Sequence, residues 1–129
     1  MILLDTHALA WSVLEPRKLS RAASAAIIQA QRGDGAAISA ITLWELASLL
    51  ARGRILASGT IDGSLKQLTE GVAIKPITSE IAALATQFPQ DYPRDPADRL
   101  IGATARAAGC GLVTADQNMR RCPLLRTIW

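Results

Sequence analysis

The sequence predicts an α/β fold in which a parallel sheet is covered by helices on both faces. Two observations support this prediction. The short apolar segments show no alternation of polar and apolar residues, which is typical of strands buried on both faces of a parallel sheet. These segments also alternate along the chain with longer helical patterns, as connections between parallel strands require.

The predicted strands are short apolar runs that end at polar residues or turn signals. The first run, Ile2-Leu3-Leu4, stops at Asp5, and the second follows the segment Gly33-Asp34-Gly35. The full set comprises residues 2–4, 36–39, 72–76 and 111–114, with residues 127–129 as a candidate fifth strand. The sheet is therefore expected to contain four or five strands.

The predicted helices lie between these strands, and capping residues mark several of their ends. Ser20 is suited to N-cap a helix that runs to about Arg32, and Asp95-Pro96 places an N-cap before a proline at the first helical position. The helical stretches are one through Trp11 that ends before Pro16, followed by residues 20–32, 41–52, 61–70, 78–87 and 95–108. Residues 88–94 form the least regular stretch, which we expect to be mobile.

A chain of 129 residues suits one domain, so we expect residues 1–129 to form a single folded unit. Charged residues make up 19% of the chain without a long like-charge run, which argues against disorder. No segment approaches the ~20 apolar residues needed to span a membrane, and a basic leader is absent. Cys110 and Cys122 have no zinc-ligand spacing and are interpreted as reduced structural thiols. These features predict a cytoplasmic protein.

The charge balance gives a formal net charge of +3, from 14 basic and 11 acidic residues. If four of the acidic residues form one site, the other seven face 14 basic groups over the rest of the molecule. A basic body around an acidic pocket favours a phosphodiester substrate. Ordinary solubility explains a net charge of +3 more simply, so charge alone does not define a function.

Four acidic residues follow predicted strands or open predicted helices, at the end of the sheet where ligands bind in open parallel sheets. Asp5 directly follows the first strand, and Asp116 lies two residues after Thr114 at the end of the fourth. Glu45 falls in the first turn of the predicted helix after the second strand, and Asp98 in the first turn of a later helix. We expect all four carboxylates to lie over one edge of the sheet.

Each carboxylate also has a purely structural interpretation. Asp5 is placed to N-cap the first helix, Asp116 to close an Asx turn, and Asp98 to interact favourably with a helix dipole. Glu45 has the spacing of a capping box with Thr42. Together, however, four carboxylates in one pocket repel one another unless a cation binds between them. Oxygen ligands without a His or Cys cluster select Mg²⁺ or Mn²⁺, and such an ion activates water to attack phosphorus.

Other catalytic chemistries have little support in the sequence. His7 is the only histidine, so the histidine pair that a metal-free ribonuclease commonly uses is absent. His7 is interpreted as a helix-surface or hydrogen-bonding residue. No glycine-rich nucleotide-binding motif and no Gly-x-Ser-x-Gly elbow occurs. Trp11, Trp44 and Trp129 are interpreted as packing residues and not as platforms for base stacking.

Four segments, in order, resemble the motifs of PIN-domain toxins of the VapC kind. The segments are residues 2–11, 38–47, 95–105 and 112–116, and their order and spacing agree over nearly the whole chain. The resemblance implies a three-layer α/β/α fold in a single PIN domain. It also implies a Mg²⁺- or Mn²⁺-dependent endoribonuclease with an RNA substrate, a cognate antitoxin that blocks the site, and a homodimer.

By motif position, the resemblance assigns catalysis and metal binding to four residues, Asp5, Glu45, Asp98 and Asp116. Thr6 and Thr114 match positions at which a hydroxyl supports these carboxylates. The third motif departs from the family pattern at Ala97 and at residues 92–94, which leaves the role of Asp95 and the substrate preference open.

Several arginines near the motifs are candidates to hold the RNA backbone, and Arg94 and Arg120 are preferred among them. Two functions other than a toxin ribonuclease are compatible with the same residues. One is a DNA-cleaving nuclease that uses the same site, and the other is a non-catalytic RNA- or partner-binding PIN module. The complete set of four acids favours catalysis, because a binding module does not need them. A phosphoryl-transfer receiver or phosphatase fits less well, since paired acids after the first strand are absent.

Overall fold

The computed structural model describes residues 1–56 and 58–129. Its central sheet has five strands in the order β3-β2-β1-β4-β5, and every neighbouring pair is parallel. The strands are β1 (Ile2–Leu4), β2 (Ala36–Ser39), β3 (Ala73–Lys75), β4 (Gly111–Val113) and β5 (Thr127–Ile128). The predicted α/β fold is confirmed, and the candidate fifth strand is present at one edge.

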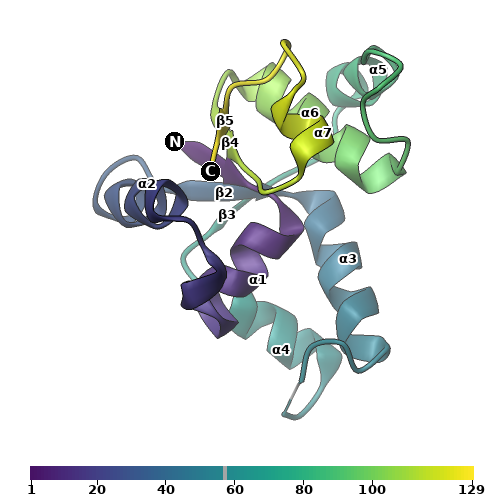
Figure 1. Cartoon of the computed structure of the whole chain (residues 1–129). Coiled ribbons are helices and arrows are strands. Elements are labelled where there is room, and N and C mark those ends of the chain that lie inside the picture. Colours follow the sequence, from purple (N-terminus) through teal and green to yellow (C-terminus); the bar gives the residue numbers. More distant parts are fainter. Residues whose placement is uncertain (57) are drawn as a thin grey trace.

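Seven α-helices cover the two faces of the sheet within the described residues (Figure 1). They are α1 (Thr6–Leu14), α2 (Arg21–Arg32), α3 (Ala40–Ala51), α4 (Ile61–Leu68), α5 (Ser79–Ala85), α6 (Pro96–Ala108) and α7 (Gln117–Arg120), with a short 3-10 turn, η1 (Pro16–Lys18). Helices α1 to α4 gather on one side of the sheet, and α5 to α7 lie on the other. This arrangement is a three-layer α/β/α architecture.

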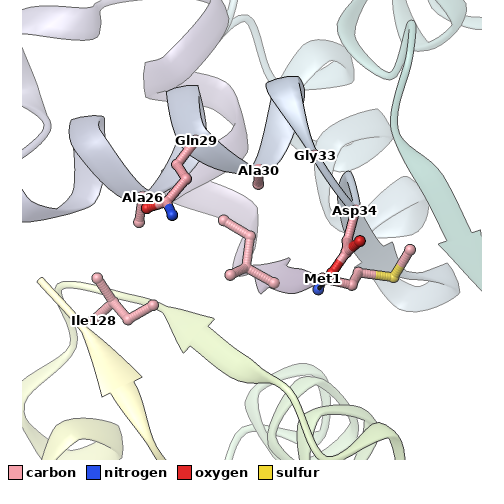
Figure 2. Close-up of a pocket in the computed structure, with 8 residues that line it drawn as sticks. Met1, Ala26, Gln29, Ala30, Gly33, Asp34 and Ile128 are labelled. Atoms are coloured by element: carbon pink, nitrogen blue, oxygen red, sulfur yellow. Dashed lines mark ion pairs between the residues drawn. The ribbon is translucent and has the colours of Figure 1, made fainter.

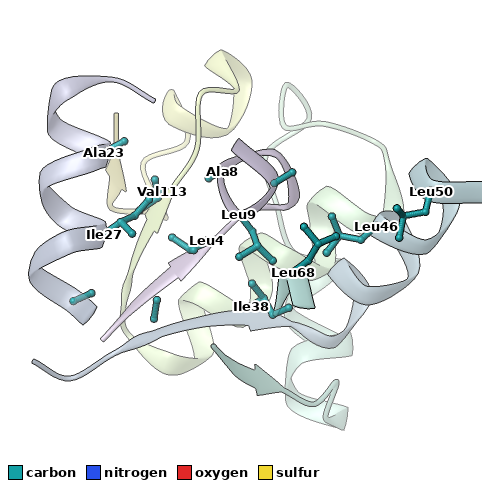
Figure 3. Packing of buried hydrophobic residues seen from close by; sticks show 13 residues of the cluster. Leu4, Ala8, Leu9, Ala23, Ile27, Ile38, Leu46, Leu50, Leu68 and Val113 are labelled. Atoms are coloured by element: carbon teal, nitrogen blue, oxygen red, sulfur yellow. The ribbon is translucent and has the colours of Figure 1, made fainter. Parts of the chain in front are cut away.

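The sheet separates two main hydrophobic clusters. Successive side chains of a strand point to opposite faces, so Leu4 packs with α1 to α4 while Leu3 packs with α6 and α7. On the first face, strand residues meet a set of large helix side chains, namely Leu9, Ile27, Leu46, Leu50 and Leu68 (Figure 3). Because both faces are covered, the strands need apolar residues at every position, which explains their continuous apolar runs.

The predicted helix and strand boundaries agree with the structure to within two residues. Ser20 N-caps α2 as predicted, because its Oγ accepts a hydrogen bond from the Ala23 amide at 3.0 Å. The turn η1 and helix α7 were not predicted, since three or four residues contain too little periodicity to identify a helix.

The irregular segment 88–94 is held by one buried aromatic residue. Tyr92 is 2% exposed, and its ring stacks on Phe88 with centroids 3.9 Å apart. The Tyr92 hydroxyl donates a hydrogen bond to the backbone carbonyl of Asp98 at 2.7 Å. This anchor ties the segment to the first turn of α6 and argues against the expected mobility.

No helix of residues 1–56 and 58–129 is long and apolar enough to cross a bilayer. Cys110 and Cys122 are both free thiols, as the sequence predicts.

Candidate metal centre

Asp5 and Asp116 follow β1 and β4, which are neighbouring strands in the sheet. Each carboxylate caps the helix after it: Asp5 Oδ1 accepts from the Ala8 amide at 2.7 Å, and Asp116 Oδ1 accepts from the Met119 amide at 2.9 Å. For Asp116 this N-cap replaces the Asx turn that the sequence suggested. A cap of this kind uses one carboxylate oxygen, so the second oxygen of each residue can bind another group.

Glu45 lies in the second turn of α3 and not in the first, because the helix begins at Ala40. Its N-cap is Ser39, so the capping-box interpretation of Glu45 with Thr42 is wrong. Thr42 is instead fully buried within the helix, and its hydroxyl lies 3.2 Å from that of Thr6. The Thr6 hydroxyl donates to Glu45 Oε1 at 2.5 Å, which holds this carboxylate against α1.

Asp98 occupies the third position of α6, behind the N-cap Asp95, as the sequence predicts. Asp95 Oδ1 accepts from the Ala97 amide at 2.8 Å. The backbone of Asp98 is held by the Tyr92 hydroxyl, so the start of α6 is fixed from two directions.

The pKa values of two site carboxyls are raised. Burial, and to a smaller extent the negative charges of Asp95, Glu45, Asp116 and Asp5, together raise the pKa of Asp98 to about 7. Burial also raises the pKa of Asp5, whereas hydrogen bonds from Thr114 and from the Ala8 amide lower it. The effect of four other carboxylates on the Asp98 pKa means that these acids share one electrostatic environment.

These acids lie near one another without converging on one point. Within the described part of the chain, no three His, Cys, Asp or Glu side chains are placed to hold an ion as they stand. Glu45 is drawn towards Thr6, and Asp5 and Asp116 are drawn towards helix amides. The donor set consists of oxygen atoms, and Mg²⁺ keeps several waters while touching only one or two carboxylates. The residues present therefore fit a divalent ion that keeps most of its water ligands. They fit less well an ion whose ligands all come from the protein.

Thr114 contacts the carboxyl of Asp5 and the backbone of Asp116. It is fully buried, its Oγ1 accepts from the Asp116 amide at 3.1 Å, and its hydrogen bond to Asp5 lowers the pKa of that carboxyl. Arg94 and Arg120 are exposed, and neither forms an ion pair within residues 1–56 and 58–129. The two arginines are therefore available to an anionic ligand.

Arg99, His7 and two of the three tryptophans each contact a neighbouring group. The Arg99 guanidinium donates to the backbone carbonyl of Ala85 at 3.3 Å. Trp11 and Trp129 pack against each other with centroids 5.8 Å apart, as predicted. His7 is exposed on the surface of α1, one of its two predicted roles, and its ring lies beside that of Trp11.

Trp44 is the aromatic residue whose predicted packing role is wrong. It is 68% exposed and lines a cleft of about 350 Å³ together with Thr6 and Glu45. Its position follows from the buried residues of α3, which recur every four residues at Thr42, Leu46 and Leu50. Trp44 lies midway between Thr42 and Leu46 in the sequence, so it is on the opposite side of the helix and faces away from the core. Helical periodicity could therefore have predicted its exposure.

A second cavity, of about 380 Å³, lies beside the start of β1 and the end of α2 (Figure 2). Its polar feature is an ion pair of 3.5 Å between the Met1 ammonium and Asp34, and none of the four site acids lines it. The acidic site and this cavity are therefore separate.

A parallel five-stranded sheet between two helical layers, with carboxylates after adjacent strands, is the architecture that the resemblance to PIN-domain proteins implies. The chain belongs to the PIN domain family, whose model matches residues 2–124. It is 43% identical to Ribonuclease VapC22 of Mycobacterium tuberculosis (strain ATCC 25618 / H37Rv), in an alignment of 130 positions that covers 99% of this chain and 98% of that protein.

Solved structures of similar fold include toxin–antitoxin complexes. VapBC2 from Rickettsia felis, bound to a promoter DNA fragment, matches with a TM-score of 0.74 and 18% identity over 98% of this chain and 97% of that chain. DNA-bound VapBC from Salmonella typhimurium matches with a TM-score of 0.74 and 19% identity over the same shares. A toxin–antitoxin complex from Klebsiella pneumoniae matches with a TM-score of 0.67 and 22% identity over 97% and 95%. This similarity confirms the three-layer fold.

Proposed function

We propose that this protein is a metal-dependent endoribonuclease that acts as the toxin of a toxin–antitoxin pair. The observation that supports it best is the group of carboxylates that together raise the pKa of Asp98 at one edge of a PIN fold. A relative named as a ribonuclease, 43% identical over 99% of the chain, favours RNA as the substrate.

Catalysis and metal binding are assigned to four residues, Asp5, Glu45, Asp98 and Asp116. A bound Mg²⁺ or Mn²⁺ ion supplies the polarisation of a phosphoryl oxygen and lowers the pKa of a water. The four carboxylates would hold that cation, and its charge would offset the mutual repulsion that adds to burial in raising the pKa of Asp98. Thr6 orients Glu45 through its hydroxyl, and Thr114 supports Asp5 in the same way.

Residues outside the four acids are proposed to bind the RNA substrate, and the protein is proposed to bind a protein partner. Arg94 and Arg120 are exposed cations close in sequence to Asp95 and Asp116, and we assign them to the RNA backbone. The partner is a cognate antitoxin, which the toxin–antitoxin complexes among similar folds support. We further propose that residues 1–129 act as a single PIN domain, as a homodimer, in the cytoplasm.

The test compares four purified proteins on structured RNA in Mg²⁺ or Mn²⁺, with and without a chelator. The proteins are the wild type, Asp5→Asn, Asp98→Asn and a matched control, Asp62→Asn, whose carboxylate pairs with Lys66 on the exposed side of α4. We expect the first two variants and the chelator to reduce cleavage by about 100-fold or more, and the control to cleave as the wild type does.

Cleavage that survives the chelator and both site substitutions contradicts the metal-site assignment. Equal cleavage of matched RNA and DNA strands would indicate a general nuclease. Absence of cleavage, with RNA bound equally by all four proteins, would indicate a binding module.

A further inference from the structure

Trp44 exposes its indole ring on α3, one residue before Glu45. It is 68% exposed and belongs to none of the hydrophobic clusters formed by the described residues. A Trp side chain carries a large apolar surface, so core packing does not account for it at this position.

The cleft that Trp44 lines also contains Glu45, one of the four proposed catalytic acids. Thr6 lines the same cleft, and so do Ser48 further along α3 and Arg52 at the C-cap of that helix. Trp44, Ser48 and Arg52 are spaced four residues apart and form one stripe along the helix. At about 1.5 Å per residue, this stripe extends for about 12 Å away from the carboxylates' end of the cleft.

The stripe offers an aromatic face, a hydroxyl and a guanidinium in succession. Arg52 has no carboxylate within ion-pair distance among residues 1–56 and 58–129. An aromatic ring that stacks on a base and an arginine that pairs with a phosphate are the groups by which proteins hold unpaired nucleotides.

We infer that Trp44, Ser48 and Arg52 form a subsite for the unpaired nucleotide beside the cleaved phosphodiester, with Trp44 stacked on its base and Arg52 paired with its phosphate. This inference rests on the proposed function and names the form of RNA that the site takes, a single-stranded segment. Trp44 is then a positioning residue, since it holds the substrate in register with Glu45 without touching the reacting atoms.

The lining of the cleft favours a nucleotide over an apolar peptide. His7, Glu45, Arg52 and Asp95 all line it, and an apolar partner would bury these polar groups without compensating hydrogen bonds. A nucleotide instead supplies an anion for Arg52, a π face for Trp44, and donors and acceptors for the other groups.

The test measures binding of a labelled single-stranded RNA by fluorescence anisotropy in a chelator, which prevents cleavage. The proteins are the wild type, Trp44→Ala, Trp44→Phe, Arg52→Gln and a control, Leu56→Ala, which truncates a 91% exposed apolar side chain that is not among the cleft residues. Each protein is also titrated with a series of the same RNA in which one nucleotide at a time is abasic. Cleavage of the intact RNA in Mg²⁺ or Mn²⁺ is recorded in parallel.

We expect Trp44→Ala to weaken binding of intact RNA about tenfold, Trp44→Phe to retain most of the affinity, and Leu56→Ala to retain all of it. An abasic nucleotide at one position should weaken binding by the wild type to a similar extent. Trp44→Ala should bind this abasic RNA and the intact RNA with equal affinity, because the variant has no indole to stack on the missing base. Arg52→Gln should reduce the salt dependence, with a slope of log Kd against log salt that is lower by about 0.7.

Thermal unfolding of each variant controls for loss of the fold. Wild-type affinity in Trp44→Ala, beside normal cleavage by the wild type, overturns the subsite and leaves the proposed function standing. Equal losses for intact RNA and for every abasic RNA also overturn it, because the effect then does not involve a base. A wild type that neither binds nor cleaves RNA overturns both the subsite and the proposed function.

Discussion

Single side chains in this protein serve the fold and the candidate site at once. Asp5 and Asp116 each use one carboxylate oxygen to cap a helix, which leaves the other oxygen for a ligand. Glu45 differs, because its partner is the Thr6 side chain and not a helix amide. Removal of the Asp5 or Asp116 carboxylate therefore affects stability as well as chemistry, whereas a change at Glu45 acts mainly on the site.

Asp98→Asn should stabilise the metal-free protein at neutral pH and have little effect in acid. The pKa of Asp98 rises from 3.8 to about 7 on folding, so its ionisation disfavours the folded state. This cost develops as the pH rises from about 4 and is complete above about 7. In a chelator we expect the Tm of the variant to exceed that of the wild type by several degrees at about pH 8, since about 1 kcal/mol shifts Tm by ~4 °C in a domain of this size.

Thermal unfolding across this pH range checks the prediction, with Asp62→Asn as the control. A difference between Asp98→Asn and the wild type that is the same at both ends of the range would contradict it.

At the scale of elements, α6 and the segment before it depend on a close approach at one glycine. A Cβ added at Gly102 would meet the Tyr92 hydroxyl and lie 2.9 Å from Cζ of Phe88. The glycine therefore lets the stacked pair of Phe88 and Tyr92 pack directly on the helix. This packing places the Tyr92 hydroxyl on the Asp98 carbonyl and so connects the core to the candidate site.

Gly102→Ala should destabilise the protein by about 1–3 kcal/mol, because the added methyl group overpacks this contact. Tyr92→Phe removes the hydroxyl nearest to the new methyl group. The double variant should therefore lose less stability than the sum of the two single variants, a coupling that urea unfolding measures. Strict additivity would show that the methyl group is accommodated elsewhere.

At the scale of the whole molecule, the chain combines a net charge of +3 with an acidic site. The basic residues outside the site supply an attraction for a polyanion that extends beyond any single contact. Such an attraction is screened by salt, so the salt dependence of RNA binding reports how many phosphates the protein contacts.

Neutralising Arg94 and Arg120 together should lower the slope of log Kd against log salt by about 1.4, the value for two contacts to single-stranded RNA. The matched control is Arg21→Gln with Arg32→Gln, two exposed arginines on α2 that give the same change in net charge. Binding titrations at several salt concentrations check both pairs. An equal change in slope for the control pair would mean that net charge, and not position, determines the effect.

The candidate site could be predicted from sequence to different extents at different residues. Asp5, Asp98 and Asp116 were placed correctly at strand ends and helix starts, since local patterns define those positions. The Thr6–Glu45 hydrogen bond joins residues 39 positions apart and required the structure. The exposure of Trp44 was missed because its neighbours in sequence are apolar, although the spacing of the buried residues of α3 contains that information.

The sequence by itself determined the α/β class, the parallel strands and most helix ends, because apolar runs, capping residues and glycines act over a few residues. It also placed Asp5, Asp98 and Asp116 after strands or at helix starts, where their oxygen atoms can serve a hard cation. Only the tertiary structure decided the strand order, the burial of Tyr92 and the raised pKa of Asp98. Each of these features depends on contacts between segments far apart in the chain. The free energy of such contacts depends on packing and desolvation, which cannot be predicted from a local sequence pattern.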